Sequence, residues 1–241
     1  MSGSHLEEIY GFGPRTAAKA RAACGPGTDP VRCAQESGLR LNWMQRVGVR
    51  YHGRWAPGMP RAEAAELLGR IAQRWEDAGL RLRVWLCGSY RRGQATVNDI
   101  DLLVQQRAGA NNNRPCTLRD LLRPLRAGGL VPADGDLVRH PLRRYLGFCR
   151  LPVGPFRRLD IHLLGAGEEP AASLLALTGS ADFNRGLRER ARELGLRLSS
   201  RALTWRDPAH PRRRRPVPGI RTERDIFAAL GVPFVQPRGR S

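Results

Sequence analysis

Apolar side chains recur at helical spacing in two stretches of the chain. In the stretch that follows Pro60 they occupy Ala64, Leu67, Leu68, Ile71 and Trp75. Residues at this spacing share one face of an α-helix, Pro suits the start of a helix, and Gly79 suits its end. The pattern predicts an amphipathic helix that begins at Arg61 and ends before Gly79, and a second helix over residues 118–127.

Other segments have the composition of buried β-strands. They are rich in Leu, Val and Ile, and they cover residues 82–87, 99–104 and 158–164. Gly88 ends the first segment and Asn98 precedes the second, as turn residues do. Residues 107–116 combine Gly, Asn and Pro, which predicts an exposed turn.

The order of these patterns divides the chain into regions. We expect short helices broken by Gly and Pro in residues 1–60, a helix followed by strands in residues 61–166, and a mixture of helix, basic loop and a short final element in residues 167–241. A chain of 241 residues can bury a sizeable core but is short for several large independent domains. The pattern therefore predicts one α+β body with subdomains.

Basic residues greatly outnumber acidic ones. Lys plus Arg is 41 against 22 for Asp plus Glu, so the net charge is +19, and Lys19 is the one lysine. A GC-rich genome would explain Arg in place of Lys, but not the net excess. Guanidinium groups suit phosphate oxygens, so the balance favours a polyanionic partner, usually nucleic acid. The run Arg212–Arg215 fits a solvated loop and a DNA-backbone contact equally well.

The five cysteines are scattered and form no CxxC pair. We therefore expect neither a zinc site nor a disulfide framework, and a protein that works in a reducing compartment inside the cell. In a eukaryotic host this would be the nucleus, and a viral origin is the alternative. No apolar run approaches the roughly 18 residues of a membrane span, and residues 1–5 lack the hydrophobic region of a signal peptide.

A pair of aspartates is the sharpest chemical feature. In a strand, residues two apart project to the same face, roughly 6.6 Å apart along the chain, so Asp99 and Asp101 share a face while Ile100 points into the core. Like charges held this close need compensation, which two Mg²⁺ ions would supply. Asp160, also flanked by apolar residues, would add a third carboxylate from a neighbouring strand. Such a site catalyses in-line phosphoryl transfer.

The turn before these aspartates fits an anion. Gly88 permits close approach of the backbone, and the Ser89 hydroxyl with the next amides would form an anion-binding nest. Arg92 would then neutralise phosphate charge. An Asp-x-Asp pair alone is common on surfaces, but Gly-Ser followed about ten residues later by an apolar-flanked Asp-x-Asp favours a catalytic site.

These residues resemble the nucleotidyltransferase superfamily and, more narrowly, the family X DNA polymerases. Residues 87–101, Cys-Gly-Ser-Tyr-Arg-Arg-Gly-Gln-Ala-Thr-Val-Asn-Asp-Ile-Asp, look like the palm motif of that family. The likeness extends from about residue 6 to the end, with further motifs at 145–152, 157–161, 178–185 and 222–234. It implies a hand-like polymerase core with a helix-hairpin-helix subdomain (1–60), a mixed-sheet palm (61–166) and a small α/β thumb that binds nucleotide and template (167–241).

The resemblance implies roles for individual positions. The metal ligands, for two Mg²⁺ ions with Mn²⁺ as a substitute, would be Asp99, Asp101 and Asp160. The nucleotide-binding residues would be Gly88, Ser89, Arg92, Asn98, Gly179 and Asn184. Of these, Ser89 and Arg92 would contact the triphosphate, Gly179 would lie beside the sugar, and Asn184 would reach the minor-groove edge of the base. The DNA-binding residues of the palm and thumb would be Arg158, Arg185 and Arg188.

The segment Gly11-Phe-Gly-Pro-Arg-Thr resembles the turn of a helix-hairpin-helix. The resemblance implies that Gly11, Gly13, Arg15 and Thr16 bind a DNA phosphate, with backbone amides facing it. In the family, a Na⁺ or K⁺ ion often joins such a turn to the DNA backbone.

The chain departs from the family pattern at several places. It starts where the polymerase core starts, so we expect no lyase activity and gap filling that depends little on a 5′-phosphate. Gly58 stands where relatives often have a phosphate-binding Arg, and Val97-Asn98 replaces a small Ser/Cys-Gly pair. Ala176-Leu177 replaces an aromatic pair beside the sugar, which predicts weaker discrimination against ribonucleotides.

The function expected from these features is template-directed addition of dNTPs to a primer 3′-hydroxyl, on gapped duplex DNA or broken ends, by a monomer acting with repair partners. A template-independent terminal transferase is the first alternative, although residues 105–117 and 132–142 are short for a loop that blocks the template. An RNA or small-molecule nucleotidyltransferase is the second. A non-catalytic DNA-binding scaffold is the third, and the aspartates argue against it.

Overall fold

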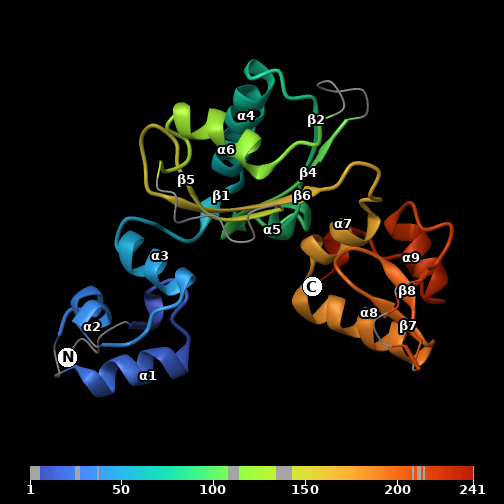
Figure 1. Ribbon diagram of the computed structural model, residues 1–241, viewed down its shortest axis with the longest axis horizontal. Helices are drawn as coiled ribbons and strands as arrows, with labels where there is room; N and C mark the ends of the chain where they lie inside the picture. The colour runs from blue at the N-terminus through green and yellow to red at the C-terminus, as the bar shows by residue number, and fades with distance from the viewer. Residues whose placement is uncertain are drawn as a thin grey trace.

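The computed structural model describes residues 6–24, 28–36, 38–107, 114–133, 143–207, 209–210, 213 and 215–240. A central sheet carries helices on one side, and the two ends of the chain form groups of elements that extend from its other side (Figure 1). Most of the turn expected at 107–116 and part of the Arg212–Arg215 run lie outside the described residues. Within the described ranges, every helix is too short or too polar to cross a lipid bilayer.

The N-terminal group consists of short helices, as the sequence predicts. They are η1 (Leu6–Glu8), α1 (Pro14–Ala23), α2 (Pro30–Glu36) and α3 (Trp43–Tyr51). Asn42 begins α3 with a capping box, because its side chain accepts from the Gln45 amide while the Gln45 side chain accepts from the Asn42 amide. Leu6, Phe12 and Ala17 belong to a small buried core between these helices.

The expectation of unpaired cysteines is wrong for two of them, because Cys24 and Cys33 form a disulfide. α1 and α2 pack through the buried Ala20 and Ala34, which brings the Cα atoms of the two cysteines to 5.7 Å. Tertiary packing of two helices can thus pair cysteines that no local motif connects. Cys87, Cys116 and Cys149 are free thiols.

The central sheet has the strand order β2-β4-β6-β5, with β4 and β6 parallel and the outer pairs antiparallel. Its strands are β2 (Leu82–Leu86), β4 (Asp99–Gln106), β5 (Arg144–Cys149) and β6 (Arg157–Leu164). The short strands β1 (Met59–Pro60) and β3 (Thr96–Val97) pair beside it. The three strands expected from sequence are therefore confirmed, and the mixed sheet agrees with the expected α+β class.

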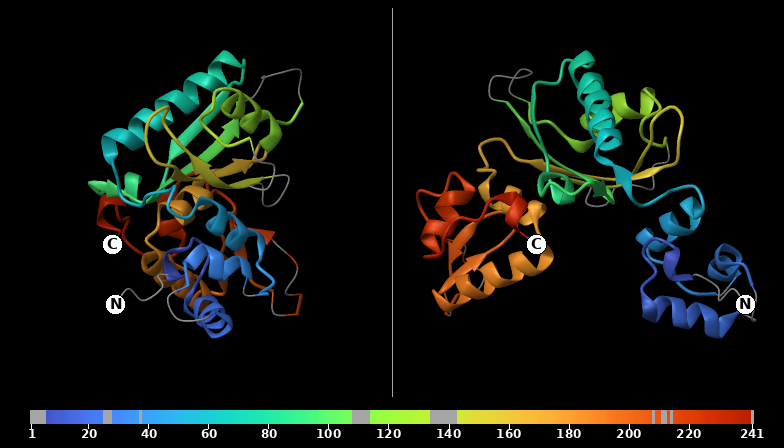
Figure 2. Two further views of the ribbon diagram at one scale, coloured as in Figure 1. Left: turned by 90° about the vertical axis from the view of Figure 1, so that its left-hand side faces the viewer. Right: turned by 180° about the vertical axis from the view of Figure 1, so that it is seen from behind.

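Helices α4 (Arg61–Asp77) and α6 (Leu118–Ala127) confirm both predicted helices and cover the same face of the sheet (Figure 2). Ile100 of β4 lies with Leu67 of α4 and Leu121 of α6 in one buried core. Because side chains alternate along a strand, the neighbours of Ile100 face the other side, toward the two terminal groups. The short helix α5 (Gly88–Arg91) connects β2 to β3 on that side.

The C-terminal group has a core of its own, which includes Leu175, Leu187 and Phe227. Its helices are α7 (Ala171–Thr178), α8 (Ala181–Glu193), α9 (Glu223–Ala229) and η4 (Pro237–Gly239). Its strands β7 (Leu196–Leu198), β8 (Leu203–Trp205) and β9 (Arg215–Pro216) form an antiparallel sheet. Ser180 caps α8 by accepting from the Phe183 amide, which fixes the turn between α7 and α8.

Candidate active site

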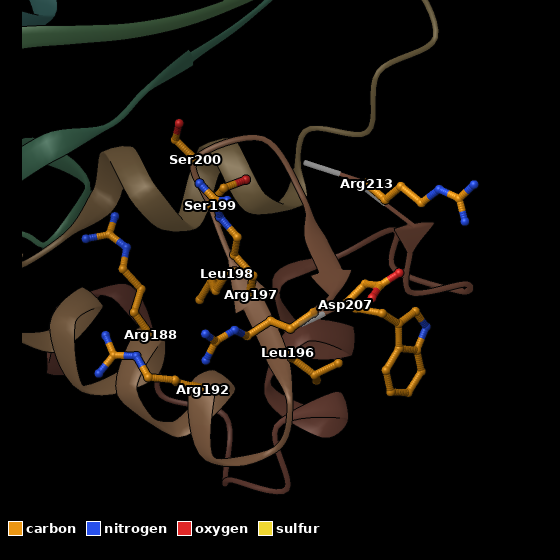
Figure 3. Close-up of a pocket in the computed structure, with 11 residues that line it drawn as sticks. Arg188, Arg192, Leu196, Arg197, Leu198, Ser199, Ser200, Asp207 and Arg213 are labelled. Atoms are coloured by element: carbon orange, nitrogen blue, oxygen red, sulfur yellow. The ribbon is translucent and has the colours of Figure 1, made fainter. Parts of the chain in front are cut away.

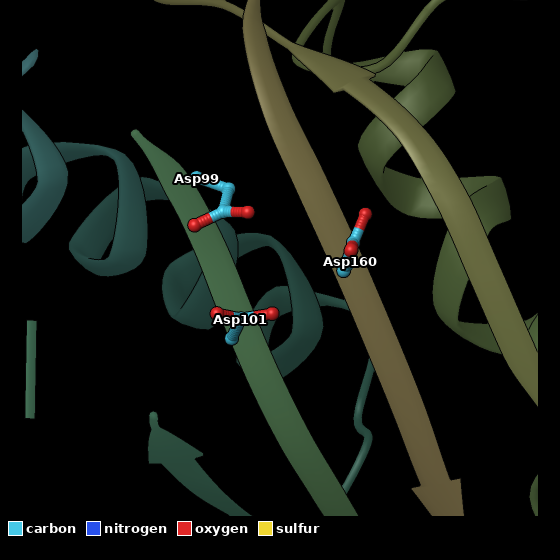
Figure 4. Close-up of side chains that lie close together, drawn as sticks. All are labelled: Asp99, Asp101 and Asp160. Atoms are coloured by element: carbon cyan, nitrogen blue, oxygen red, sulfur yellow. The ribbon is translucent and has the colours of Figure 1, made fainter. Parts of the chain in front are cut away.

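Three carboxylates converge on the open face of the central sheet (Figure 4). Asp99 and Asp101 project from β4, and Asp160 projects from β6, where it pairs with Asp101 in the parallel register. One oxygen from each carboxylate lies within 4.8 Å of the others. The parallel pairing of β4 and β6 is what brings residues about sixty positions apart into one cluster, as the sequence predicts.

Burial and mutual repulsion disfavour ionisation of this cluster. Burial, followed by the charges of Asp99 and Asp160, raises the pKa of Asp101 to about 8. Burial also raises the pKa of Asp160 to about 6, although the Arg158 guanidinium opposes the shift. The protein alone therefore does not compensate the negative charge that these side chains would carry together.

The donor set fits a hard divalent cation. The three carboxylates supply only oxygen ligands, which Mg²⁺ prefers. Among the residues that the structure describes, the buried Oδ1 of Asp160 has no hydrogen-bond partner. A buried polar atom without a partner is costly, so a cation here would satisfy it and relieve the repulsion together.

Arg158 partly neutralises the cluster. Its Nη1 lies 3.3 Å from Oδ2 of Asp99 and its Nη2 lies 3.1 Å from Oδ2 of Asp160. The guanidinium also stacks over the Tyr10 ring at 4.7 Å, so the N-terminal group contributes a side chain beside the carboxylates. The sequence predicts DNA binding for Arg158, and in this structure the side chain faces the aspartates.

The turn after β2 lies directly against the carboxylates. Gly88 has a φ of +58°, and a Cβ built on it would lie 2.1 Å from Oδ2 of Asp101, so only glycine fits. The buried Oγ of Ser89 has no hydrogen-bond partner among the described residues. The Ser89 hydroxyl thus has no partner within the described residues, which fits the anion-binding role predicted for this turn.

The turn between α7 and α8 approaches α5. Gly179 has a φ of +71° and follows Thr178, whose carbonyl accepts a hydrogen bond from Nη1 of Arg92. Asn184 is buried, and its side-chain amide donates to the Ala176 carbonyl at 2.9 Å. Asn98 is exposed immediately before β4. Arg92 and Gly179 therefore lie together, whereas Asn184 is engaged within its own subdomain.

The predicted hairpin turn lies at the start of α1. Gly11 has a φ of +84°, and Gly13 precedes Pro14 as the N-cap residue. Arg15 is exposed, whereas Oγ1 of Thr16 accepts a hydrogen bond from Nε2 of Gln45 on α3. The turn is thus held against α3, and the side chain of Arg15 is exposed at its surface.

A basic cleft of about 780 Å³ lies between α8 and the β7–β8 hairpin (Figure 3). Its arginines come from α8, from the hairpin and from the loop after it, and they are Arg188, Arg192, Arg197, Arg206 and Arg213. None of them pairs with a carboxylate among the described residues. The predicted contact Arg185 lies outside this set and forms an exposed ion pair with Asp182.

Other residues near the site escape sequence reasoning. Glu223 accepts hydrogen bonds from Arg91 and from Arg240, and it joins α9 to α5 and to the C-terminal segment. Arg91 directly precedes Arg92, which the sequence analysis predicts as a triphosphate contact, so its position could have pointed to a role near the site. Arg240 is 1% exposed, and nothing in the sequence indicates this, because arginine is seldom fully buried. The contact of Tyr10 with Arg158 is not indicated by any local sequence motif either.

Comparison with known proteins gives consistent matches over most of the chain. Residues 58–166 match the family model described as DNA polymerase beta palm, and residues 173–241 match DNA polymerase beta thumb. DNA polymerase lambda of Rattus norvegicus is 34% identical over 90% of this chain and 40% of its own length, and that of Arabidopsis thaliana is 25% identical over 97% and 45%. The chain thus spans less than half the length of these relatives.

A solved structure shares the whole architecture. It is described as Leishmania infantum polymerase beta in a ternary P/T complex, and it has a TM-score of 0.80 and 26% sequence identity. The match covers 98% of this chain and 96% of that one. The likeness therefore includes the N-terminal helices, which the two family models do not reach.

Proposed function

Because this chain belongs to the family X DNA polymerases, we propose that it is a template-directed DNA polymerase that adds dNTPs to a primer 3′-hydroxyl. Its substrates would be short gaps or broken ends in DNA, as in repair and end joining. The observation that carries the proposal is the convergence of Asp99, Asp101 and Asp160 beside the Gly88–Ser89 turn. Carboxylates that would hold two metal ions beside a turn suited to an anion are what two-metal phosphoryl transfer to a nucleotide would use.

The carboxylates perform the central chemistry. Asp99, Asp101 and Asp160 would hold two Mg²⁺ ions, or Mn²⁺ in their place, which stabilise the attacking and leaving oxygens of an in-line displacement. The 3′-oxygen of the primer bonds to the α-phosphorus as the bond to the β-phosphate oxygen breaks, and pyrophosphate leaves. Asp160 would lie on the side of the attacking hydroxyl, where it would hold the ion that activates this group or accept its proton.

Arg158 would exchange partners during this reaction. It pairs with Asp99 and Asp160 in the chain alone, so a cation bound to those aspartates would displace it. The released guanidinium would bind a phosphate of the primer strand, in line with its predicted DNA contact.

The incoming nucleotide would lie between α5 and the turn at Gly179. The Ser89 hydroxyl and the Arg92 guanidinium would bind the triphosphate, with Gly88 allowing close approach and Asn98 at the edge of the pocket. Gly179 would lie beside the sugar. Asn184 would contact the minor-groove edge of the base, for which its amide would leave the Ala176 carbonyl.

DNA would contact the two terminal groups. Gly11, Gly13, Arg15 and Thr16 would bind a backbone phosphate, with Na⁺ or K⁺ between turn and phosphate. The template strand would lie against Arg185 and Arg188 on α8, where the basic cleft supplies further guanidinium groups.

The proposed organisation follows the three groups of elements. Residues 1–60 would bind DNA, residues 61–166 would form the catalytic palm, and residues 167–241 would bind nucleotide and template. Each group contains buried apolar residues of its own. We propose a monomer that acts inside the cell, in the nucleus of a eukaryotic host, together with repair proteins.

Primer extension with Mg²⁺ on gapped, nicked and single-stranded DNA, with each dNTP and NTP, tests this function. We expect templated extension on gapped DNA and little on single strands. Robust extension of single-stranded primers would favour a terminal transferase. No extension of any of these DNA substrates would contradict the proposal.

A further inference from the structure

An aromatic side chain of the N-terminal group lies against the arginine beside the carboxylates. Tyr10 directly precedes Gly11 of the predicted hairpin turn, and the Arg158 guanidinium carbon lies 4.7 Å from the centre of its ring. The same guanidinium reaches Asp99 at 3.3 Å and Asp160 at 3.1 Å. Arg158 is therefore held between an aromatic ring and two carboxylates.

Neighbouring elements fix the position of Tyr10. Its ring packs edge-to-face with Phe148 of β5, at 5.9 Å between ring centres, and with Trp55 of the segment between α3 and β1, at 6.3 Å. Its backbone is approached by α3, because a Cβ built on Gly48 would lie 1.8 Å from the Tyr10 carbonyl oxygen. Only glycine permits this approach. Tyr10 therefore presents its ring to Arg158 from a fixed position.

The Arg158 guanidinium keeps an unused donor. Its Nε is buried and has no hydrogen-bond partner in the part of the chain that the structure describes. The ion pairs with Asp99 and Asp160 thus leave the guanidinium incompletely satisfied, whereas a phosphate would offer oxygens to more of its donors. Arg158 is therefore suited to exchange the aspartates for a phosphate.

We propose that Tyr10 is a positioning residue, which holds Arg158 on the aspartates while DNA is absent and so makes cation binding at Asp99 and Asp160 depend on DNA. This inference rests on the proposed function. A guanidinium and a metal ion compete for the same carboxylate oxygens, and the cation–π contact with Tyr10 favours the guanidinium. A primer phosphate would take Arg158 from the aspartates, and the metal ion would then bind more tightly.

The coupling between DNA and cation acts in both directions. If DNA lowers the Kd for the metal ion by some factor, the metal ion lowers the Kd for DNA by the same factor. In the free chain, Arg158 would offset the charge of the aspartates in place of a metal ion. The metal ion would bind these aspartates tightly only in the complex that contains the primer 3′-hydroxyl.

Binding of Mn²⁺ tests the inference without any need for polymerase activity. Electron paramagnetic resonance would measure free Mn²⁺, and Asp99→Asn would identify the share that is bound at the aspartates. We expect Tyr10→Leu to lower the Kd of the DNA-free chain for this Mn²⁺ about fivefold, the scale of one partly desolvated cation–π contact. The Kd in the presence of gapped DNA should change little. Tyr10→Phe keeps the ring and should bind Mn²⁺ as the unchanged chain does.

Companion measurements separate this role from packing. Tyr10→Leu/Arg158→Gln should have the same Kd for Mn²⁺ as Arg158→Gln, because Tyr10 acts only through the guanidinium. Loss of folding would raise the Kd, so it cannot produce the expected decrease.

Three results would overturn the inference. They are a Kd for Mn²⁺ in Tyr10→Leu that is not lower than that of the unchanged chain, a decrease that persists beside Arg158→Gln, and equal affinities of the unchanged chain for Mn²⁺ with and without gapped DNA. A chain that binds Mn²⁺ as expected but cannot extend a primer contradicts the proposed function alone.

Discussion

The side chains at the carboxylate cluster leave negative charge that the protein alone does not compensate. Asp101 is held beside Asp99 and Asp160, so the folded chain resists carrying all three charges. Arg158 offsets part of this repulsion from one side. The cluster is thus a site of local destabilisation in the protein alone, which bound cations would relieve.

The metal-free protein should lose stability as the pH rises toward about 8. The folded-state pKa of Asp101 is raised to about 8 from 3.8, so its contribution to stability is present below the unfolded pKa and is lost as the pH rises through the folded one. Thermal unfolding in EDTA should show this loss for the unchanged chain and a smaller loss for Asp101→Asn. Identical pH profiles for the two proteins would contradict this assignment.

Gly88→Ala should abolish most activity. Its Cβ would lie 2.1 Å from Oδ2 of Asp101 and would displace that carboxylate, and misplacement of a catalytic group by about 1 Å costs roughly a hundredfold in rate. Gly79→Ala is the matched control, because Gly79 also has a positive φ but no atom within 4 Å of a built Cβ. Both variants carry backbone strain, so equal kcat values for the two would show that the close approach is unimportant.

Among the elements, those with strong local patterns were predictable. α6 has the predicted bounds because its apolar stripe starts after the capping box of Thr117 with Asp120. β4 was predictable because Ile100 and Leu102 alternate with Asp99 and Asp101. The sequence favours a strand with Asp160 beside β4, but the parallel register of β4 with β6, the disulfide and the burial of Arg240 depend on long-range packing, which no local pattern encodes.

The side chains at the C-terminal end of α7 lead us to expect weak discrimination between deoxyribonucleotides and ribonucleotides. The resemblance to the family implies that Ala176 and Leu177 replace an aromatic pair beside the sugar, and Leu177 packs against a small cluster that includes Cys87 and Leu103. With less bulk near Gly179, the ratio of kcat/KM for dGTP to that for GTP should be lower than in a polymerase that has the aromatic pair, usually Tyr-Phe, at these positions. Ala176→Tyr/Leu177→Phe should raise this ratio, and an unchanged ratio would show that the backbone turn alone selects the sugar.

On the scale of the whole molecule, charge is distributed to suit DNA. The net charge is +19, and five arginines line the basic cleft on the C-terminal group, although α6 on the far face of the central sheet also carries the exposed Arg119 and Arg123. The N-terminal and C-terminal groups extend from the carboxylate side (Figure 1). A duplex in contact with both groups would therefore bring its primer end to the aspartates.

Replacement of cleft arginines should weaken the salt dependence of DNA binding. Removing one phosphate-binding charge lowers the slope of log K against log salt by about 0.9, so Arg192→Gln/Arg197→Gln should lower it by roughly one to two units. Arg119→Gln/Arg123→Gln on α6 removes the same charge from the far face and serves as the control. Equal slopes of log K against log salt for the two double variants would show that the DNA does not bind at the basic cleft.

Single-turnover incorporation by Asp160→Ala, on a short-gapped DNA with Mg²⁺, tests the central claim most directly. Asp160 is proposed to hold the ion that activates the attacking hydroxyl, or to accept the proton of that hydroxyl, and it is not a proposed DNA contact. Incorporation should therefore fall by at least about a thousandfold, the scale of losing an essential catalytic group, while the Kd for the DNA stays within a few-fold of that of the unchanged chain. Incorporation at a rate near that of the unchanged chain would contradict the carboxylate mechanism.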